Sequence, residues 1–197
     1  MTNVKELLTT TLMDMMETTP LEKITVKDVA DKCGVSRQSF YYHFSDIYDI
    51  LKYIFIKETE KALNEYSDID SWQLGYVRLM KWSLKNKNLV LNTFFSIRRE
   101  YVEVFMSKVL YKYIIKVVTE EAKGLKVTKE QCDFIANFYT LAINAQTADW
   151  LRHNMTEKPE KIAEKVSIVL EGTFHRALLG FQDDNRKKSK DKRKDLS

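Results

Sequence analysis

The sequence predicts an all-α protein with a small three-helix head and a larger helical body. Apolar residues recur at helical spacing, and no convincing alternation typical of β-strands occurs. Only 5 glycines and 2 prolines interrupt the 197 residues, which favours long helices and short connections. Hydrophobic residues make up 44% of the chain and charged residues 30%, enough for a packed core. We expect about nine helices, in a head at 1–47, a body at 48–181 and a tail at 182–197.

The head is predicted from helix-start and turn signals. A first helix covers about 3–18, and Thr25 then caps a short second helix, with Asp28 in the position of a capping-box partner. Gly34 follows, where a glycine lets the backbone turn with a positive φ. Ser36 caps a third helix that ends near residue 43. Two short helices joined by this turn form a helix-turn-helix.

Beyond the head, the apolar period predicts a series of longer helices. Thr128 and Gln131 form a capping pair at the start of one of them. Pro159 lies in the first turn of the last, where its missing N–H costs nothing. The predicted ranges are about 46–66, 69–86, 88–95, 97–122, 128–154 and 158–180.

The third helix carries the chemistry that points to a function. Phe40 anchors it to the core, while its opposite face shows polar side chains, namely Arg37, Gln38, Ser39, Tyr42 and His43. Arginine suits guanine, glutamine suits adenine, and hydroxyls and histidine suit phosphates. No acidic residue lies between Lys32 and Ser45. A helical hairpin inside an ordinary α-domain would explain the apolar spacing, but not two caps, a turn glycine and an acid-free polar face together.

The same stretch resembles the tetracycline-repressor (TetR) family of transcription regulators. The resemblance lies in Thr, then Val-x-x-Val-Ala, Gly-Val-Ser and Phe-Tyr-x-His-Phe, within about residues 5 to 55. It implies that Thr25 and Ser36 touch phosphates through hydroxyl and helix-end N–H groups. It also implies that Arg37, Gln38 and Ser39 face bases, and that Tyr41, Tyr42 and His43 line the phosphate backbone of the DNA. The DNA-binding residues expected from it are Thr25, Ser36, Arg37, Gln38, Ser39, Tyr41, Tyr42 and His43.

Two departures from the family pattern weaken the expected contact with DNA. Many members carry a lysine shortly after the last Phe, where this chain has Ile47 and Tyr48. Residues 1–48 hold five basic and seven acidic side chains, so the charge of the head is 5 − 7 = −2. This predicts weaker and less salt-dependent binding than a basic head would give. The segment FYYHFSDIYDIL is also similar to a subgroup that includes an activator of dihydroxyacetone-kinase operons, which acts with a partner protein.

The body is expected to hold a small-molecule effector and a dimer face. Its aromatic residues can wall a cavity or simply fill a core. The candidate ligand-binding residues are Trp72, Tyr76, Phe94, Phe95, Tyr101 and Phe105. The last two predicted helices carry apolar stripes that can pair with a second copy or pack within the chain. The candidate dimer residues are Phe138, Leu141, Ala145, Ala148, Val166, Val169, Leu170 and Phe174.

Other classes of function find no support in the sequence. There is no apolar run of membrane-spanning length and no signal-peptide core, so we expect a cytoplasmic protein. Cys33 and Cys132 read as free thiols, and neither lies at metal-ligand spacing from a histidine, so no metal or other cofactor is expected. Two pairs at i,i+4 spacing, Asp149 with His153 and Glu171 with His175, are read as surface pairs rather than catalytic dyads. We do not expect an enzyme.

The tail accounts for most of the net charge of +4. Residues 182–197 hold seven basic and four acidic side chains, or 7 − 4 = +3, and no apolar period. This composition predicts a disordered segment that either keeps the chain soluble or attracts phosphates without specificity.

The sequence thus predicts a DNA-binding transcription regulator, expected to be a repressor. It would bind a near-palindromic operator as a homodimer and be controlled by a small-molecule effector. The alternative is an activator or coactivator that needs a protein partner, motivated by the acidic head and Ile47.

Overall fold

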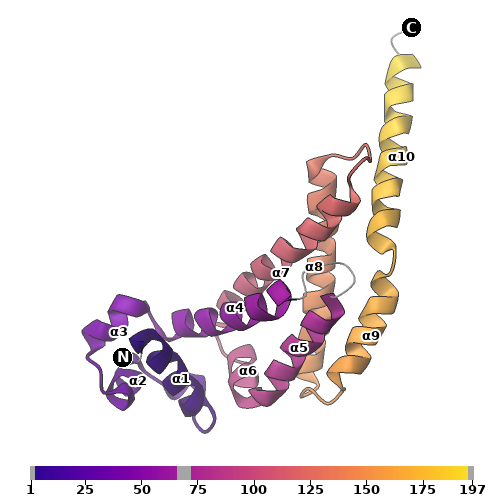
Figure 1. Cartoon of the computed structure of the whole chain (residues 1–197). Helices are drawn as coiled ribbons and strands as arrows, with labels where there is room; N and C mark the ends of the chain where they lie inside the picture. The colour runs from indigo at the N-terminus through magenta and orange to yellow at the C-terminus, as the bar shows by residue number, and fades with distance from the viewer. Residues whose placement is uncertain (1–2, 66–71, 195–197) are drawn as a thin grey trace.

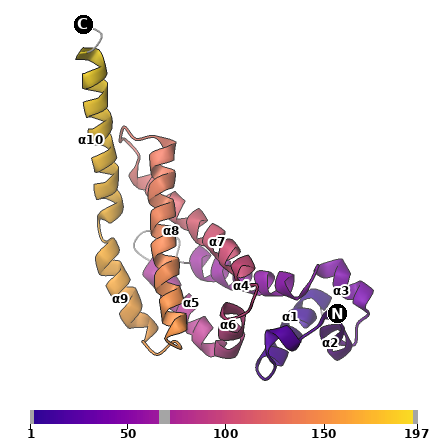
Figure 2. The same cartoon turned by 180° about the vertical axis from the view of Figure 1, so that it is seen from behind.

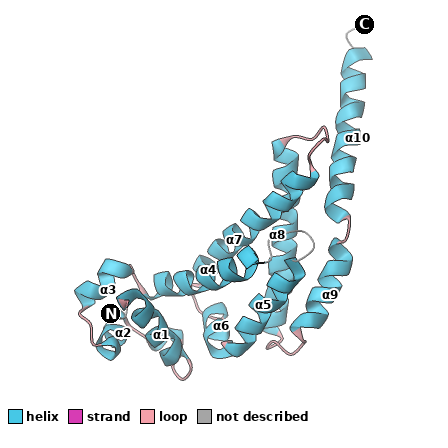
Figure 3. Ribbon diagram, viewed as in Figure 1, coloured by secondary structure: helices cyan, strands magenta, loops and turns pink. Residues whose placement is uncertain are grey.

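The computed structural model describes residues 3–65 and 72–194, with the side chains of residues 63, 65, 101 and 188–194 excepted. Within these ranges all regular structure is helical, as Figure 3 shows. The elements are α1 (Val4–Met16), the 3-10 turn η1 (Leu21–Lys23), α2 (Val26–Cys33), α3 (Arg37–His43), α4 (Ile47–Glu65), α5 (Trp72–Lys85), α6 (Lys87–Phe94), α7 (Arg99–Glu121), α8 (Lys129–Arg152), α9 (Pro159–Leu170) and α10 (Thr173–Lys194). The predicted fold class is confirmed.

The predicted caps and turn of the head are present. Thr25 and Asp28 form a full capping box at α2, and the Ser36 hydroxyl accepts from the Ser39 N–H at 3.1 Å. Gly34 has φ 68°, and its N–H and that of Val35 donate to carbonyls of the last turn of α2. This left-handed residue turns the chain between α2 and α3 at no steric cost.

A shared core holds the head together. Leu8 and Leu12 of α1, Val29 of α2, Phe40 of α3 and Ile50 of α4 are all fully buried. Helix α4 leaves this core and runs along α7, so it belongs to both the head and the body (Figure 1). The head therefore sits on a rigid helix rather than on a flexible linker.

The body is a helical bundle in which α7 packs between α4 and α8, while α5 packs against α4 and α9 (Figures 1 and 2). The short α6 lies between α5 and α7 and contacts α1, so it is a second junction between head and body. Val118 of α7, Ala136 of α8 and Leu178 of α10 are fully buried.

Two expectations for the C-terminal part were wrong. The last predicted helix, 158–180, is two helices, because Gly172 takes φ 67° and breaks the chain between α9 and α10. The break also separates Glu171 from His175, which instead lies 3.9 Å from Glu121 of α7.

The tail is helical as far as Lys194, where the sequence predicted disorder. It continues α10, which is tied to the body through Gln182, whose side-chain oxygen accepts from the Lys126 N–H at 2.8 Å. Beyond this contact α10 projects past the other helices, on the side away from the head (Figures 1 and 2).

Candidate DNA interface and effector cavity

Helix α3 presents its polar face to solvent at the outer end of the head. Phe40 is fully buried, and Arg37, Gln38, Tyr41 and Tyr42 on the other sides are exposed, Tyr42 to 85%. Ser39 and His43 are half-buried. The rings of Tyr41 and Phe40 pack edge to face, with centroids 5.6 Å apart, so Tyr41 contacts the core. The ring of Tyr42 packs on that of His43, with centroids 5.0 Å apart.

The two predicted capping residues differ in what they can offer a phosphate. The Thr25 hydroxyl donates to the Asp28 carboxylate at 2.6 Å, so its single proton is taken and a negative charge lies beside it. The Ser36 hydroxyl accepts from the Ser39 N–H and keeps its proton. A hydroxyl can accept and donate at once, so Ser36 can still donate to a phosphate oxygen.

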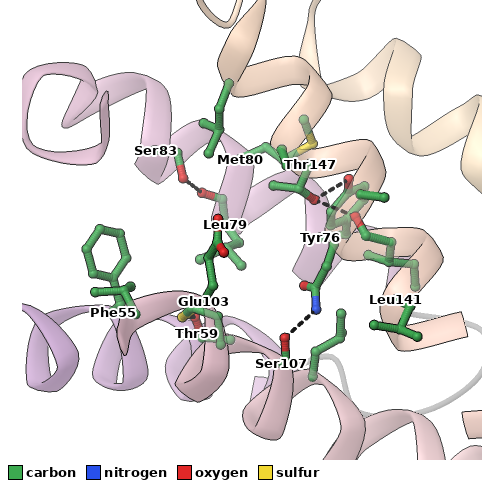
Figure 4. Close-up of a pocket in the computed structure, with 18 of the residues that line it drawn as sticks. Phe55, Thr59, Tyr76, Leu79, Met80, Ser83, Glu103, Ser107, Leu141 and Thr147 are labelled. Atoms are coloured by element: carbon green, nitrogen blue, oxygen red, sulfur yellow. Dashed lines mark hydrogen bonds between the residues drawn. The ribbon is translucent and has the colours of Figure 1, made fainter. Parts of the chain in front are cut away.

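A cavity of about 490 Å³ lies inside the body, between α4, α5, α6, α7 and α8 (Figure 4). Three of the candidate ligand residues line it: Trp72, Tyr76 and Phe94. Two do not: Phe95 points outward with 61% of its surface exposed, and Phe105 packs under the Lys52 ammonium at 3.9 Å. The side chain of Tyr101 lies outside the described residues.

The polar groups of the cavity wall are paired with one another. Thr147 donates to the Ile143 carbonyl at 2.9 Å, so the 3.0 Å contact between the Tyr76 and Thr147 hydroxyls has Tyr76 as the donor. Burial raises the pKa of Tyr76, so the phenol stays neutral. The Asn144 amide donates to the Ser107 hydroxyl at 2.8 Å, as the dashed lines of Figure 4 show.

Charged residues line only one end of the cavity, and none of them is among the candidate ligand-binding residues predicted from the sequence. Arg99 begins α7 and Arg152 ends α8, and their guanidinium carbons lie 5.6 and 5.8 Å from the ring of Phe94. Glu103 lies one turn beyond Arg99, with its carboxylate oxygen 3.7 Å from the Arg99 Nε. Arg99 and Arg152 are 53 positions apart, and the antiparallel packing of α7 on α8 brings them to one place, so local spacing could not reveal that they share a site.

The candidate dimer residues divide between the surface and the interior. Phe138, Leu141 and Val169 are more than half exposed, and Ala145 is exposed beside them. Phe134 and Ile168 extend this apolar face, at 63% and 68% exposure. Val166, Leu170 and Phe174 are half-buried, and the ring of Phe174 packs on Tyr139 at 4.6 Å. Leu141, Ala145, Ala148, Leu170 and Phe174 also line the cavity.

Hydrogen bonds join α6 to the end of α1. The Asn88 amide donates to the Glu17 carbonyl at 3.1 Å and to its carboxylate at 3.0 Å. The Asn92 amide lies 3.4 Å from the Met16 carbonyl and 3.3 Å from that of Thr19. Because Val90, Thr93 and Phe94 of α6 line the cavity, this short helix touches both the cavity and the head.

Within the described ranges, no group of three or more His, Cys, Asp or Glu side chains is placed to hold a metal ion. Among the same residues no helix is both long and apolar enough to cross a membrane.

Comparison with known proteins gives the chain its family. Residues 9–54 match the family described as bacterial regulatory proteins, tetR family, and residues 70–172 match the transcriptional regulator C-terminal region of the same family. A curated relative, the HTH-type dhaKLM operon transcriptional activator DhaS of Lactococcus lactis subsp. lactis (strain IL1403), is 24% identical over 148 residues, or 74% of this chain and 78% of the relative.

Solved structures agree on the fold. The dihydroxyacetone kinase operon activator DhaS superposes with a TM-score of 0.66 at 21% identity, covering 86% of this chain and 95% of that one. The fatty acid degradation regulator FadR of Bacillus halodurans superposes with a TM-score of 0.57 at 12% identity, covering 89% of this chain and 94% of FadR. The repressor AlkX of Dietzia sp. strain DQ12-45-1b, implicated in n-alkane biodegradation, superposes with a TM-score of 0.53 at 13% identity, covering 90% of this chain and 98% of AlkX. With its head and body both matched, the chain belongs to the TetR family: it is a DNA-binding transcription regulator and not an enzyme.

Proposed function

We propose that the protein binds a near-palindromic operator as a homodimer, with one α3 in the major groove of each half-site. The observation that carries this proposal is the contrast across α3, where Phe40 is fully buried and Arg37, Gln38 and Tyr42 stand in solvent. Arg37 and Gln38 lie in the first turn of α3, where a recognition helix contacts base edges. Ser39 is a further candidate for a base contact, and Tyr41, Tyr42 and His43 are candidates for the flanking phosphates.

Of the two capping hydroxyls, those of Thr25 and Ser36, the geometry leaves only that of Ser36 as a proposed phosphate contact. Its hydroxyl keeps a proton for a phosphate oxygen, whereas the Thr25 hydroxyl is already donated to Asp28. Asp28 also places a negative charge at the start of α2. The Thr25 backbone N–H also donates to the Asp28 carboxylate, at 2.9 Å, so we assign Thr25 a structural role at the helix start.

The exposed apolar face of α8 and α9 is the proposed dimer interface. Five apolar side chains of this face are each more than half exposed: Phe134, Phe138 and Leu141 on α8, and Ile168 and Val169 on α9. Regulators of this family act as dimers, and a two-fold axis lets two heads read two half-sites. Covering this face would also remove a large exposed apolar surface from water.

Effector control is proposed to run from the cavity through α6. A molecule that fills the cavity meets Phe94 and Val90, and α6 is bonded to the end of α1 through Asn88 and Asn92. A ligand that binds better when α6 has moved would shift the population toward states with a different spacing of the two heads. If the protein is a repressor, as we expect, this change in the spacing of the heads releases it from DNA. Such a regulator would act in the cytoplasm, where the chromosome is.

A second candidate function is that of an activator that needs a protein partner. The relative DhaS is by its printed name an operon activator, and the head of this chain carries the −2 charge noted above. Phe95 and Ile97, exposed to 61% and 84% beside the head, are apolar side chains that a partner protein could cover.

Fluorescence anisotropy with a labelled fragment of the chain's own promoter tests these proposals. The wild-type protein alone should bind, and Arg37→Ala should lose about 1–3 kcal/mol of binding free energy together with sequence preference. Equal affinity of wild type and variant for this fragment would contradict the assignment of α3. Tight binding by the purified protein alone at physiological salt would exclude the need for a partner.

A further inference from the structure

We propose that the effector is an elongated, mainly apolar molecule that ends in one anionic group, and that Arg152 together with Arg99 receives this group. The inference rests on the proposed function, in which the body cavity binds the effector, and deepens it by naming the chemical class.

The shape of the cavity favours a long ligand. On α7 its lining residues recur at helical spacing from Arg99 to Val117, which are 18 positions apart. At a rise of 1.5 Å per residue this is about 27 Å of helix. On α8 the lining runs from Leu141 to Arg152. A cavity of about 490 Å³ drawn out along two helices fits a chain better than a compact ring system.

The middle of the cavity favours an apolar ligand body. Phe55, Met80 and Leu110 line it. Its hydroxyl and amide groups bond to one another, as in the Tyr76–Thr147 pair, or to backbone carbonyls, as Ser83 does to that of Leu79. Figure 4 shows Phe55 and Thr59 of α4, Leu79 and Ser83 of α5 and Ser107 of α7 around the same space. A wall whose polar groups are already satisfied offers little to a polar ligand body.

The charged end favours an anion. Arg99, Glu103 and Arg152 are the charged residues that line the cavity, so the net charge there is +1. The Arg99–Glu103 contact of 3.7 Å is loose and half-exposed. Arg152 is exposed at this end of the cavity, and its guanidinium lies over the Phe94 ring. Within the described part of the chain no carboxylate forms an ion pair with it. A guanidinium left without a counter-charge beside an apolar cavity can form charge-assisted bonds to a carboxylate or phosphate.

The test uses the full chain and four probes with one alkyl chain: dodecanoate, dodecyl phosphate, dodecanol and dodecylammonium. Titration calorimetry is done on wild type, on Arg152→Gln and on Arg186→Gln, a matched change on the exposed part of α10 away from the cavity. At least one anionic probe should bind about tenfold more tightly than dodecanol, and Arg152→Gln should remove most of that difference. Arg186→Gln should change neither the affinity for the anionic probes nor that for dodecanol. Comparison of the two anions shows whether the site prefers a carboxylate or a phosphate.

Equal binding of dodecanol or dodecylammonium and the anions would overturn the proposal, as would unchanged anion affinity in Arg152→Gln. If that variant fails to fold, Glu103→Gln gives the opposite test: removal of the negative charge should tighten anion binding about threefold, and unchanged or weaker binding would overturn the proposal. Anion binding that depends on Arg152 but leaves operator affinity unchanged would support the assigned chemistry and contradict effector control, so the two failures are distinguishable.

Discussion

The ammonium group of Lys57 lies 2.7 Å from the carboxylate of Glu6, and this ion pair joins α4 to the first helix of the head. Tyr53, one turn earlier on α4, donates to the same oxygen at 3.2 Å. The Lys57 hydrogen bond lowers the pKa of Glu6 and raises that of Lys57. Because α4 belongs to both the head and the body, these contacts help to fix the orientation of α1 on it.

Replacement of Glu6 by Gln should destabilise the protein slightly. Both side chains are nearly half exposed, so solvent screens the pair, and we expect a loss of less than about 1 kcal/mol in the free energy of unfolding by urea. Glu120→Gln breaks a similarly short pair, between the last turn of α7 and Lys123 just after it, and serves as the control for charge removal at an exposed site.

The effect of Glu6→Gln should also depend on pH. The folded-state pKa of Glu6 lies below its ordinary value of 4.5, so its stabilisation is present above that pH and is lost as the pH falls through the folded-state pKa. The difference between wild type and variant should therefore shrink toward zero in acid. A difference that stays constant from neutral pH to about one unit below the folded-state pKa would show that the ion pair is not its source.

A side chain at Gly34, in the turn of the helix-turn-helix, should lower the free energy of unfolding. Its φ of 68° is a left-handed conformation, and although a Cβ there would meet nothing within 4 Å, Gly34→Ala should cost about 1–2 kcal/mol through backbone strain. Gly180→Ala is the matched control, because this glycine lies within α10 without positive φ and a Cβ there also meets open space. It should stabilise α10 by about 0.5–1 kcal/mol. We expect thermal unfolding to show a lower melting temperature for Gly34→Ala and a higher one for Gly180→Ala. A shift of both melting temperatures in the same direction would contradict the assignment of backbone strain at Gly34.

The elements that could be predicted are those whose signals are local. Thr25, Ser36 and Thr128 begin helices because each accepts a backbone N–H two or three residues away, and such caps are visible in sequence. Gly172 carried the same kind of signal as Gly34 but lies within an apolar period that continues on both sides. The periodicity therefore hid the break between α9 and α10.

The candidate site could be predicted only in part, because its cavity depends on tertiary packing. Phe94 and Phe95 are neighbours, yet one lines the cavity and the other points into solvent. Arg99 and Arg152 meet only because α7 and α8 are antiparallel. The predicted dimer stripe likewise mixed residues of the exposed face with Val166, which packs against the core.

Phe138→Glu should prevent dimer formation. Phe138 is 57% exposed at the centre of the apolar face of α8 and does not line the cavity, so the change adds a charge to the proposed interface without altering the effector site. Sedimentation should show a monomer, and operator affinity should fall with it. Ile97→Glu, at an 84% exposed residue beside the head, should remain a dimer. A dimeric Phe138→Glu variant would place the interface elsewhere.

The basic end of α10 should contribute nothing to operator binding. It projects from the body on the side away from the head, so it cannot reach the DNA that α3 contacts (Figure 1). A chain that ends at Lys187 should keep the wild-type affinity and the same slope of log affinity against log salt. A slope reduced by about 0.9 for each lost phosphate contact would show that the tail touches DNA.

DNase footprinting of the chain's own promoter tests the central claim most directly, that paired α3 helices read the DNA. The account predicts two protected half-sites related by an approximate two-fold axis, with centres about 10–10.5 base pairs or a multiple apart. The double variant Arg37→Ala, Gln38→Ala should lose this pattern, while Arg186→Ala should keep it. An unchanged footprint with the double variant would contradict the account.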